Sequence, residues 1–407
     1  MNFDLSEDQR MMSDSFAGFL NEHSNMERVR AAAENGGFDA ELWSGLAELG
    51  AFCLRIPEEG GGLGLGVMDA AVLMEEAGRT LASGPLAETL VASRVLGVLA
   101  AESQAALLEE VIAGSKIVSI ALHDITEQPV QWVAGGAVAD AVVARNGDKV
   151  VLVSVSGDNR GEENLASTPI AELDLAAGET AVLGEGADAI AVFAQAVEEW
   201  KLLMAIALAG LSRESVRLAA EYACERVAFD KPIGTYQAIS HPLADLITEI
   251  DGGKYFAWKA IHDIAADEKD AGAQISMALY WNADVAARAV TQSLHTFGGY
   301  GLATEYDIHL YNLRAKGWPL VAGDINLLME EAGRRLYAGE TVALPDVGEV
   351  GIDFNLGDTA REMAQELDVQ RNPDPRATCQ SALLFRWFRS RCTQKIGREK
   401  FPVSRLA

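Results

Sequence analysis

The chain has 407 residues, and 33 Lys and Arg residues stand against 60 Asp and Glu residues, which gives a formal net charge of −27 at pH 7. So acidic a chain repels phosphate backbones and anionic lipid head groups, which excludes a general nucleic-acid-binding protein. Hydrophobic residues make up 49% and charged residues 23%, as in a globular protein of two or three domains. The apolar run at residues 202–211 is about half of the roughly 20 residues that span a bilayer, so no membrane insertion is expected.

The first part of the chain has a helical pattern. Residues 1–115 are rich in Ala, Leu and Glu at helical spacing, and Ser6 is placed to cap the first of these patterns. They predict an N-terminal helical domain. The acidic N-terminus has neither the positive nor the apolar region of a secretory signal, so we expect a cytoplasmic protein.

A glycine-rich segment, residues 55–66, interrupts these helices. Glycines let backbone N–H groups approach a phosphate, which makes a nucleotide-binding loop one interpretation. However, no strand clearly precedes the segment, no Lys-Ser or Lys-Thr follows it, and it contains the carboxylates of Glu58 and Glu59. A structural turn between helices is therefore the favoured interpretation.

Residues 116–192 have a different sequence pattern. Short β-branched runs, separated by Gly-Asp and Gly-Glu turns, occupy residues 117–120, 141–143 and 150–153. This pattern predicts a small middle β domain.

The helical pattern returns over residues 193–345. The run 202–211 is apolar on all sides and so belongs inside a helical bundle. Breaks at residues 230–234, 270–272 and 298–301 leave about four long helices. The predicted fold class is therefore α+β, with an N-terminal helical domain, a small β domain and a C-terminal four-helix bundle.

The composition changes again at residues 346–407, where we predict a linker and a tail. Residues 353–358 echo residues 2–7, and the stretch from Val369 onward is basic in an otherwise acidic chain. The tail is either a truncated second module or a basic, partly disordered end, and we expect it to pack loosely or not at all on the rest.

No spacing in the chain predicts a metal site or a nucleophile. The four cysteines, at positions 53, 224, 379 and 392, form no CxxC pair, and the six histidines form no HExxH motif. The Gly-x-Ser-x-Gly turn of a serine hydrolase is also absent from the sequence.

Two clusters in the C-terminal region carry more chemistry. Residues 225–241 end one helix and start another, and an Arg beside an aromatic ring there can hold a pyrophosphate while the ring packs on a purine. Residues 295–307 end a helix with glycines that would not obstruct a flat ligand. Each cluster alone is also compatible with an ordinary corner between helices.

Together, on an α–β–α frame, the clusters resemble the acyl-CoA dehydrogenase family. The family pattern reads Arg-x-x-Phe-Gly-x-x-Ile-Gly-x-x-Gln, followed by Gly-Gly-x-Gly before the last helices. The resemblance covers roughly residues 2–340 and includes the Pro-Glu-Glu-Gly-Gly turn at residues 57–61. It implies FAD between the β domain and the bundle, with its diphosphate and adenine held largely by a neighbouring subunit.

The resemblance also assigns roles to individual residues. Arg226 would meet the FAD diphosphate, and Gly298 and Gly299 would let the partner's cofactor approach closely. His295 stands where the family usually has Gln, and it can still donate a hydrogen bond. The adenine side would be lined by Phe229, Ile233 and Gln237.

The implied reaction is α,β-dehydrogenation of an acyl-CoA thioester, in which a carboxylate removes a proton and the flavin takes a hydride. One usual position of that carboxylate falls at Ala322 in this chain, and the other falls at Trp200. Glu199, one residue away, is the remaining candidate for the base, although one residue on a helix rotates a side chain by about 100°.

The β domain also departs from the family, because the Thr-Glu-Pro-x-x-Gly-Ser-Asp motif is missing. The chain resembles the degenerate member of a heteromeric or tandem-fused bacterial dehydrogenase for fatty acids or steroid side chains. We therefore expect a homo- or hetero-oligomer with another acyl-CoA dehydrogenase subunit, and a separate electron acceptor. The alternatives are a non-catalytic scaffold for a sibling dehydrogenase and a helical bundle unrelated to flavin.

Overall fold

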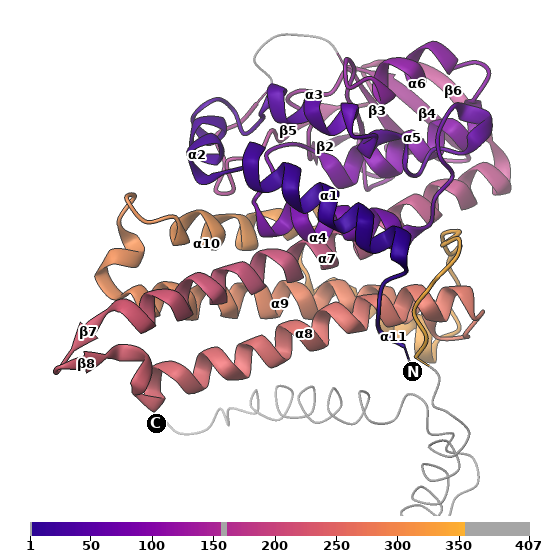
Figure 1. The fold of residues 1–407 in the computed structure, drawn as a ribbon. Helices are drawn as coiled ribbons and strands as arrows, with labels where there is room; N and C mark the ends of the chain where they lie inside the picture. Colours follow the sequence, from indigo (N-terminus) through magenta and orange to yellow (C-terminus); the bar gives the residue numbers. More distant parts are fainter. Residues whose placement is uncertain (1, 156–160, 355–407) are drawn as a thin grey trace, which may run out of the picture. The chain divides into compact units, whose positions relative to one another are not determined.

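The computed structural model describes residues 2–155 and 161–354 (Figure 1). Residues 4–352 form one compact unit, and the two chain ends around Asn2 and Asp353 belong to a second unit. The tail predicted for residues 355–407 lies outside the described residues, so both interpretations of it stay predictions. Within the described part, the predicted α+β fold class is confirmed, with helices first, strands in the middle and a helical bundle last.

The N-terminal part is helical. Its α-helices are α1 (Glu7–His23), α2 (Met26–Glu34), α3 (Ala40–Glu48), α4 (Val67–Arg79), α5 (Leu86–Ala100) and α6 (Ala105–Ile112). Ser6 caps α1 as expected, because its hydroxyl accepts a hydrogen bond from the Gln9 backbone N–H at 3.1 Å. The Gln9 side chain accepts one in return from the Ser6 backbone N–H at 3.2 Å, which completes a capping box.

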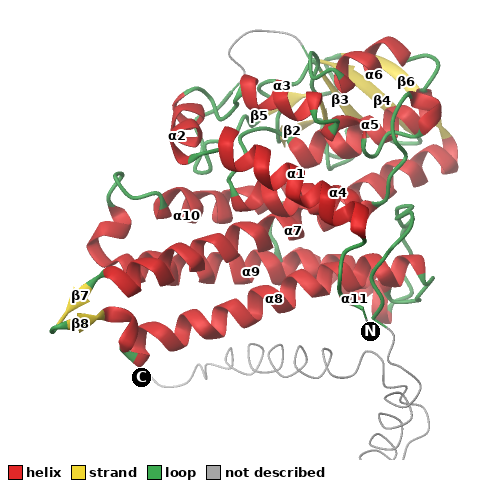
Figure 2. Ribbon diagram, in the orientation of Figure 1, coloured by secondary structure: helices red, strands yellow, loops and turns green. Residues whose placement is uncertain are grey.

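Strands occupy the middle of the chain (Figure 2). Four of them, in the spatial order β1-β3-β4-β6, form one sheet: β1 (Val118–Ile120), β3 (Ala141–Asn146), β4 (Lys149–Ser154) and β6 (Glu179–Glu185). β1 runs parallel to β3, and the other neighbours are antiparallel. A separate antiparallel ribbon pairs β2 (Val130–Val133) with β5 (Ala171–Asp174). Alternate residues such as Val142, Ala144, Val151 and Val153 fill a core shared with this ribbon.

The bundle has three long helices rather than four. These are α7 (Gly186–Glu225), α8 (Gln237–Ala265) and α9 (Ala271–Phe297), and two shorter ones follow, α10 (Ile308–Gly317) and α11 (Asn326–Tyr337). The remainder is divided because Gly298 ends α9 with a φ of 61°, and a further turn with Pro319 and Gly323 separates α10 from α11. Helix α9 packs against the other four, so the bundle architecture itself is as expected.

Helix α7 links the β region to the bundle. It begins at Gly186, directly after β6 and before the boundary predicted at residue 193. Its run at residues 202–211 is buried throughout, as its all-round apolar pattern predicted. Helix α4 packs on α7 where two glycines meet backbone. A Cβ at Gly78 would lie 1.9 Å from the Ala207 carbonyl oxygen, and one at Gly210 would lie 2.1 Å from the Glu75 carbonyl oxygen.

The segment at residues 346–352 is not part of a loosely packed tail, which corrects the prediction for this stretch. Val347 and Ile352 are 4% and 3% exposed. The Val347 carbonyl accepts a hydrogen bond of 3.0 Å from the backbone N–H of Val67, at the start of α4. The segment is therefore anchored because it satisfies an otherwise unpaired donor at a helix N-terminus.

The echo between residues 2–7 and 353–358 has a structural counterpart in the second unit. Asn2 and Asp353 form an antiparallel bridge with two backbone hydrogen bonds of 2.7 Å. The rings of Phe3 and Phe354 lie next to each other, with centroids 4.7 Å apart. The described parts of the two similar sequences thus pair with each other.

Candidate active site

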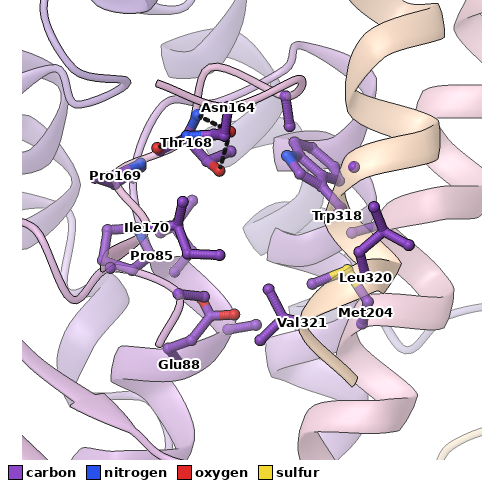
Figure 3. A pocket seen from close by; sticks show the side chains of 18 of the residues that line it. Pro85, Glu88, Asn164, Thr168, Pro169, Ile170, Met204, Trp318, Leu320 and Val321 are labelled. Carbon is purple, nitrogen blue, oxygen red and sulfur yellow. Dashed lines mark hydrogen bonds between the residues drawn. The ribbon is translucent and has the colours of Figure 1, made fainter. Parts of the chain in front are cut away.

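An apolar cavity of about 330 Å³ lies among the N-terminal helices, the β2–β5 ribbon and the bundle (Figure 3). Its walls come from α4, the turn into α5, the end of β2, the loop at residues 162–170, α7, and the residues around the end of α10. Side chains that define it include Met74, Pro85, Trp132, Ile170, Met204 and Val321. Such a cavity suits a ligand with a largely apolar body.

The loop at residues 162–170 forms the outer rim of this cavity. Its shape is fixed because the Asn164 side chain donates a hydrogen bond of 2.7 Å to the Thr168 carbonyl and accepts one of 3.1 Å from the Thr168 backbone N–H. The loop also touches α10, since a Cβ at Gly317 would lie 2.5 Å from the Ala166 methyl group. Glu162 and Glu163 on this rim are exposed.

A buried arginine on α10 holds the opposite wall. Arg314 is 2% exposed, and its guanidinium donates hydrogen bonds to the Leu81 carbonyl and, at 2.9 Å, to the Ser83 hydroxyl. Burial lowers the pKa of Arg314 to about 10. These bonds fix the turn between α4 and α5, where Leu81 has a φ of 54°, a backbone conformation that a leucine seldom adopts.

The buried acid of the cavity is Glu88, on α5. It is 6% exposed, and its Oε1 accepts a hydrogen bond of 2.8 Å from Trp200 Nε1 on α7. Figure 3 shows the carboxyl group pointing from α5 toward the space bounded by Val321 and Ile170. Burial raises the pKa of Glu88, and the Trp200 hydrogen bond opposes that rise only in part.

Glu199, the predicted base, lies elsewhere. It is 0% exposed, and Arg55 donates hydrogen bonds of 2.6 and 2.8 Å to its two oxygens. Arg94 lies 3.8 Å away, and Glu199 does not line the cavity. Its role as a base is untested and stays a prediction, although both of its oxygens are already engaged.

The hydrogen bonds of Arg55 account for the structure of the glycine-rich segment at residues 55–66. Its guanidinium also donates hydrogen bonds to the carbonyls of Leu65 and, at 2.8 Å, of Asp346. Burial alone would lower the pKa of Arg55, but the Glu199 carboxylate more than offsets this and the pKa is raised. The segment is thus a turn between helices, and the guanidinium of its Arg55 binds groups of the same chain. This agrees with the favoured interpretation of a structural turn.

Ala322 ends the 3₁₀ helix η5 (Trp318–Ala322), next to the cavity residue Val321. The structure therefore puts a methyl group beside the cavity at the position where the family resemblance places a carboxylate.

The other predicted site residues gather at the end of α7 and α9. Arg226 caps α7, and its guanidinium lies 5.5 Å from the centre of the Tyr300 ring. The two helix ends are joined by the stacked rings of Tyr222 and Phe297, 4.2 Å apart. A Cβ at Gly298 or Gly299 would meet no atom within 4 Å, so both glycines face open space.

The remaining members of this cluster are also accessible. Phe229 is 89% exposed in the turn between the short strands β7 (Val227–Ala228) and β8 (Lys231–Pro232). Gln237, at the start of α8, and His295, near the end of α9, are exposed too. Ile233 is half-buried, and its backbone N–H donates a hydrogen bond of 2.8 Å to the Arg226 carbonyl. None of these residues lines the cavity that contains Glu88.

Two features are absent from the residues that the structure describes. None of their helices combines the length and apolar character needed to cross a membrane. No three of their His, Cys, Asp or Glu side chains gather in a way that would hold a metal ion.

Comparison with known proteins gives consistent matches. The family model for the acyl-CoA dehydrogenase N-terminal domain matches residues 6–115, and the model for the acyl-CoA dehydrogenase C-terminal domain matches residues 190–337. The acyl-CoA dehydrogenase IpdE2 of Mycobacterium tuberculosis is 30% identical over 313 residues, which cover 76% of this chain and 92% of the relative. IpdE2 of Mycolicibacterium smegmatis is 29% identical over 316 residues, or 77% and 94%.

Solved structures agree with these matches. The ChsE4–ChsE5 complex from Mycobacterium tuberculosis is similar with a TM-score of 0.70 and 25% identity, over 84% of this chain and 100% of that chain. A variant of the steroid ACAD Tcur3481–Tcur3483 is similar with a TM-score of 0.73 and 25% identity, over 82% and 98%.

Proposed function

Because the chain belongs to the acyl-CoA dehydrogenase family, we propose that it is an FAD-dependent module for the α,β-dehydrogenation of an acyl-CoA thioester, active together with a second dehydrogenase subunit. The observation that carries the proposal is the apolar cavity where the helical, β and bundle parts of the chain meet. It provides a water-poor site for an acyl group, which the chemistry requires. We expect the reaction to take place in the cytoplasm.

The exposed cluster at the end of α7 and α9 fits the diphosphate and adenine of FAD. Arg226 lies over the Tyr300 ring and makes no ion pair within the described part of the chain, so its guanidinium is available for a diphosphate. The open backbone at Gly298 and Gly299 leaves room for a close approach. We propose that Phe229, Ile233, Gln237 and His295 complete this cofactor site, as the resemblance implies. When bound, FAD supplies the hydride acceptor, which protein side chains do not provide.

The exposed cluster and the cavity have no residue in common, which supports a functional site shared between two subunits. We propose that the exposed cluster serves the cofactor of a neighbouring subunit, while the cavity beside Val321 receives the acyl group. A separate electron acceptor must then reoxidise the cofactor.

The lack of a carboxylate at the two usual positions of the catalytic base supports dependence on a partner subunit. Removal of a proton next to the thioester requires a carboxylate, but Ala322 and Trp200 occupy its two usual positions, and Glu199 is bound by Arg55. The structural relative ChsE4–ChsE5 is described as a complex. We propose that the second subunit of this protein supplies the carboxylate.

The same missing base favours the second candidate function, a non-catalytic scaffold for a sibling dehydrogenase. Visible absorbance of the purified chain, with and without a co-expressed sibling, distinguishes the two. A yellow protein with the flavin bands is the expected result. A colourless chain that still binds the sibling would support the scaffold, and a colourless chain that binds neither would contradict both functions.

A further inference from the structure

Glu88 is an unusual residue for the inside of an acyl-binding cavity. Of the charged side chains that line the cavity among the described residues, Glu162 and Glu163 are exposed on the rim and Glu88 alone is buried. A buried carboxyl group is costly unless its polar atoms are hydrogen-bonded. The partners of each Glu88 oxygen therefore show what the residue does.

The Glu88 carboxyl group has few hydrogen-bond partners among the described residues. Oε1 accepts the hydrogen bond from Trp200 Nε1, and the other donor that acts on the carboxyl group among the described residues is the backbone N–H of Glu88 itself. Burial favours the protonated acid, and the proton belongs on Oε2 because Oε1 is already an acceptor. An O–H donor thus faces an apolar cavity, where a bound ligand can accept its hydrogen bond.

We propose that Glu88 donates a hydrogen bond through Oε2 to an oxygen atom on the acyl group, so that the substrates are acyl-CoA thioesters whose largely apolar acyl group carries a carbonyl or hydroxyl oxygen. This inference rests on the proposed function and deepens it, because it assigns a specificity-determining residue to the cavity. Trp200 is the positioning residue, since its indole N–H fixes the orientation of the carboxyl group.

The geometry distinguishes this role from that of a catalytic base. A base must be ionised to take a proton, whereas the apolar walls, and the absence of a cation beside Glu88 among the described residues, favour the neutral acid. A neutral carboxylic acid in an apolar site is instead a good hydrogen-bond donor. Glutamine keeps a donor at this position and leucine does not, so the two substitutions separate the roles.

The test measures binding rather than turnover. The full-length chain, with its cofactor and partner subunit bound, is titrated by calorimetry with cyclohexylpropanoyl-CoA and with its three ring-ketone analogues. We expect at least one ketone to bind about three- to tenfold more tightly than the parent thioester, the range for one neutral hydrogen bond. Glu88→Gln should keep this preference and Glu88→Leu should abolish it. Glu109→Gln, which changes an exposed acid on α6 that does not line the cavity, is the matched control and should leave both affinities unchanged.

Each other outcome decides against the inference in a distinguishable way. If the parent thioester binds but no ketone is favoured, or if Glu88→Leu keeps the preference, the inference fails while the proposed function stands. If no thioester binds at all, both fail. If Glu88→Gln binds normally but the complex no longer turns over, Glu88 is a base and not a recognition residue. Infrared difference spectra check the protonation state, since a carboxylic-acid band of Glu88 should be present in the wild type and vanish in both variants.

Discussion

At the scale of the residue, the burial of Glu88 makes stability depend on pH. The unfolded chain releases this proton near the ordinary glutamate pKa of 4.5, while burial raises the pKa in the folded chain. The stabilising contribution is therefore fully present below pH 4.5 and is lost as the pH rises through the folded-state pKa. Relative to Glu88→Gln, the wild type should lose unfolding free energy as the pH rises above 4.5, measured by urea denaturation. Glu163→Gln should show no such trend. A difference between wild type and Glu88→Gln that stays constant over this range would show that Glu88 is ionised in the folded state.

Arg226 allows a second test at this scale. A guanidinium that holds a diphosphate makes charge-assisted hydrogen bonds, so Arg226→Ala should weaken FAD retention by roughly 1.5–3 kcal/mol. Flavin occupancy after dialysis gives the measurement. Arg213→Ala is the control, because Arg213 lies on the same helix but is paired with Asp251. Equal flavin occupancy in both variants would remove Arg226 from the cofactor site.

The sequence singles out some residues of the site and misses others for a physical reason. Arg226, Phe229 and the glycines after α9 lie within short local motifs, so a pattern can find them. Glu88 belongs to no motif, and its environment comes from Trp200, 112 residues away in the chain. The Arg55–Glu199 pair is likewise separated by 144 residues. Burial and pairing of isolated charges depend on such tertiary contacts, which local patterns do not contain.

At the scale of the element, the glycines in the α4–α7 crossing have a testable role. A Cβ at Gly78 would lie 1.9 Å from a carbonyl oxygen of α7, so Gly78→Ala must push the helices apart. We expect a loss of at least about 1–3 kcal/mol in unfolding free energy, the typical cost of overpacking a core. Gly252→Ala in α8 is the matched control, since its Cβ would meet nothing within 4 Å and should stabilise the helix by up to about 1 kcal/mol. Chemical denaturation of both variants checks this. Similar stabilities would show that the α4–α7 crossing can accommodate an added methyl group at Gly78.

The element pattern was largely predictable because helical and strand periods are local. The apolar run of α7 and the β-branched runs of β1, β3 and β4 lie where the sequence indicates. The number of long bundle helices was not predictable from the same breaks. Whether a glycine turn divides a helix or merely bends it depends on packing. Here it depends on the contact between Gly317 and Ala166 and on the positive φ of Gly298.

At the scale of the whole molecule, the missing base gives a prediction for activity. The isolated chain should oxidise acyl-CoA thioesters slowly or not at all even with added FAD, because no carboxylate stands at Ala322 or Trp200. Adding the partner subunit should restore turnover, measured with an artificial electron acceptor. Fast turnover by the chain alone that Glu199→Gln abolishes would overturn this expectation and establish Glu199 as the base.

The position of α7 in the chain also matters during synthesis. Helix α4 buries its apolar face against α7, whose apolar stretch ends at residue 211, well after α4 ends at Arg79. At roughly 5–20 residues per second, a ribosome needs on the order of ten seconds to make the intervening chain. During that time the nascent N-terminal helices must keep an uncovered apolar surface, which is a substrate for chaperones. The newly made protein should therefore depend on such helpers until α7 has emerged, even though the finished fold buries this surface completely.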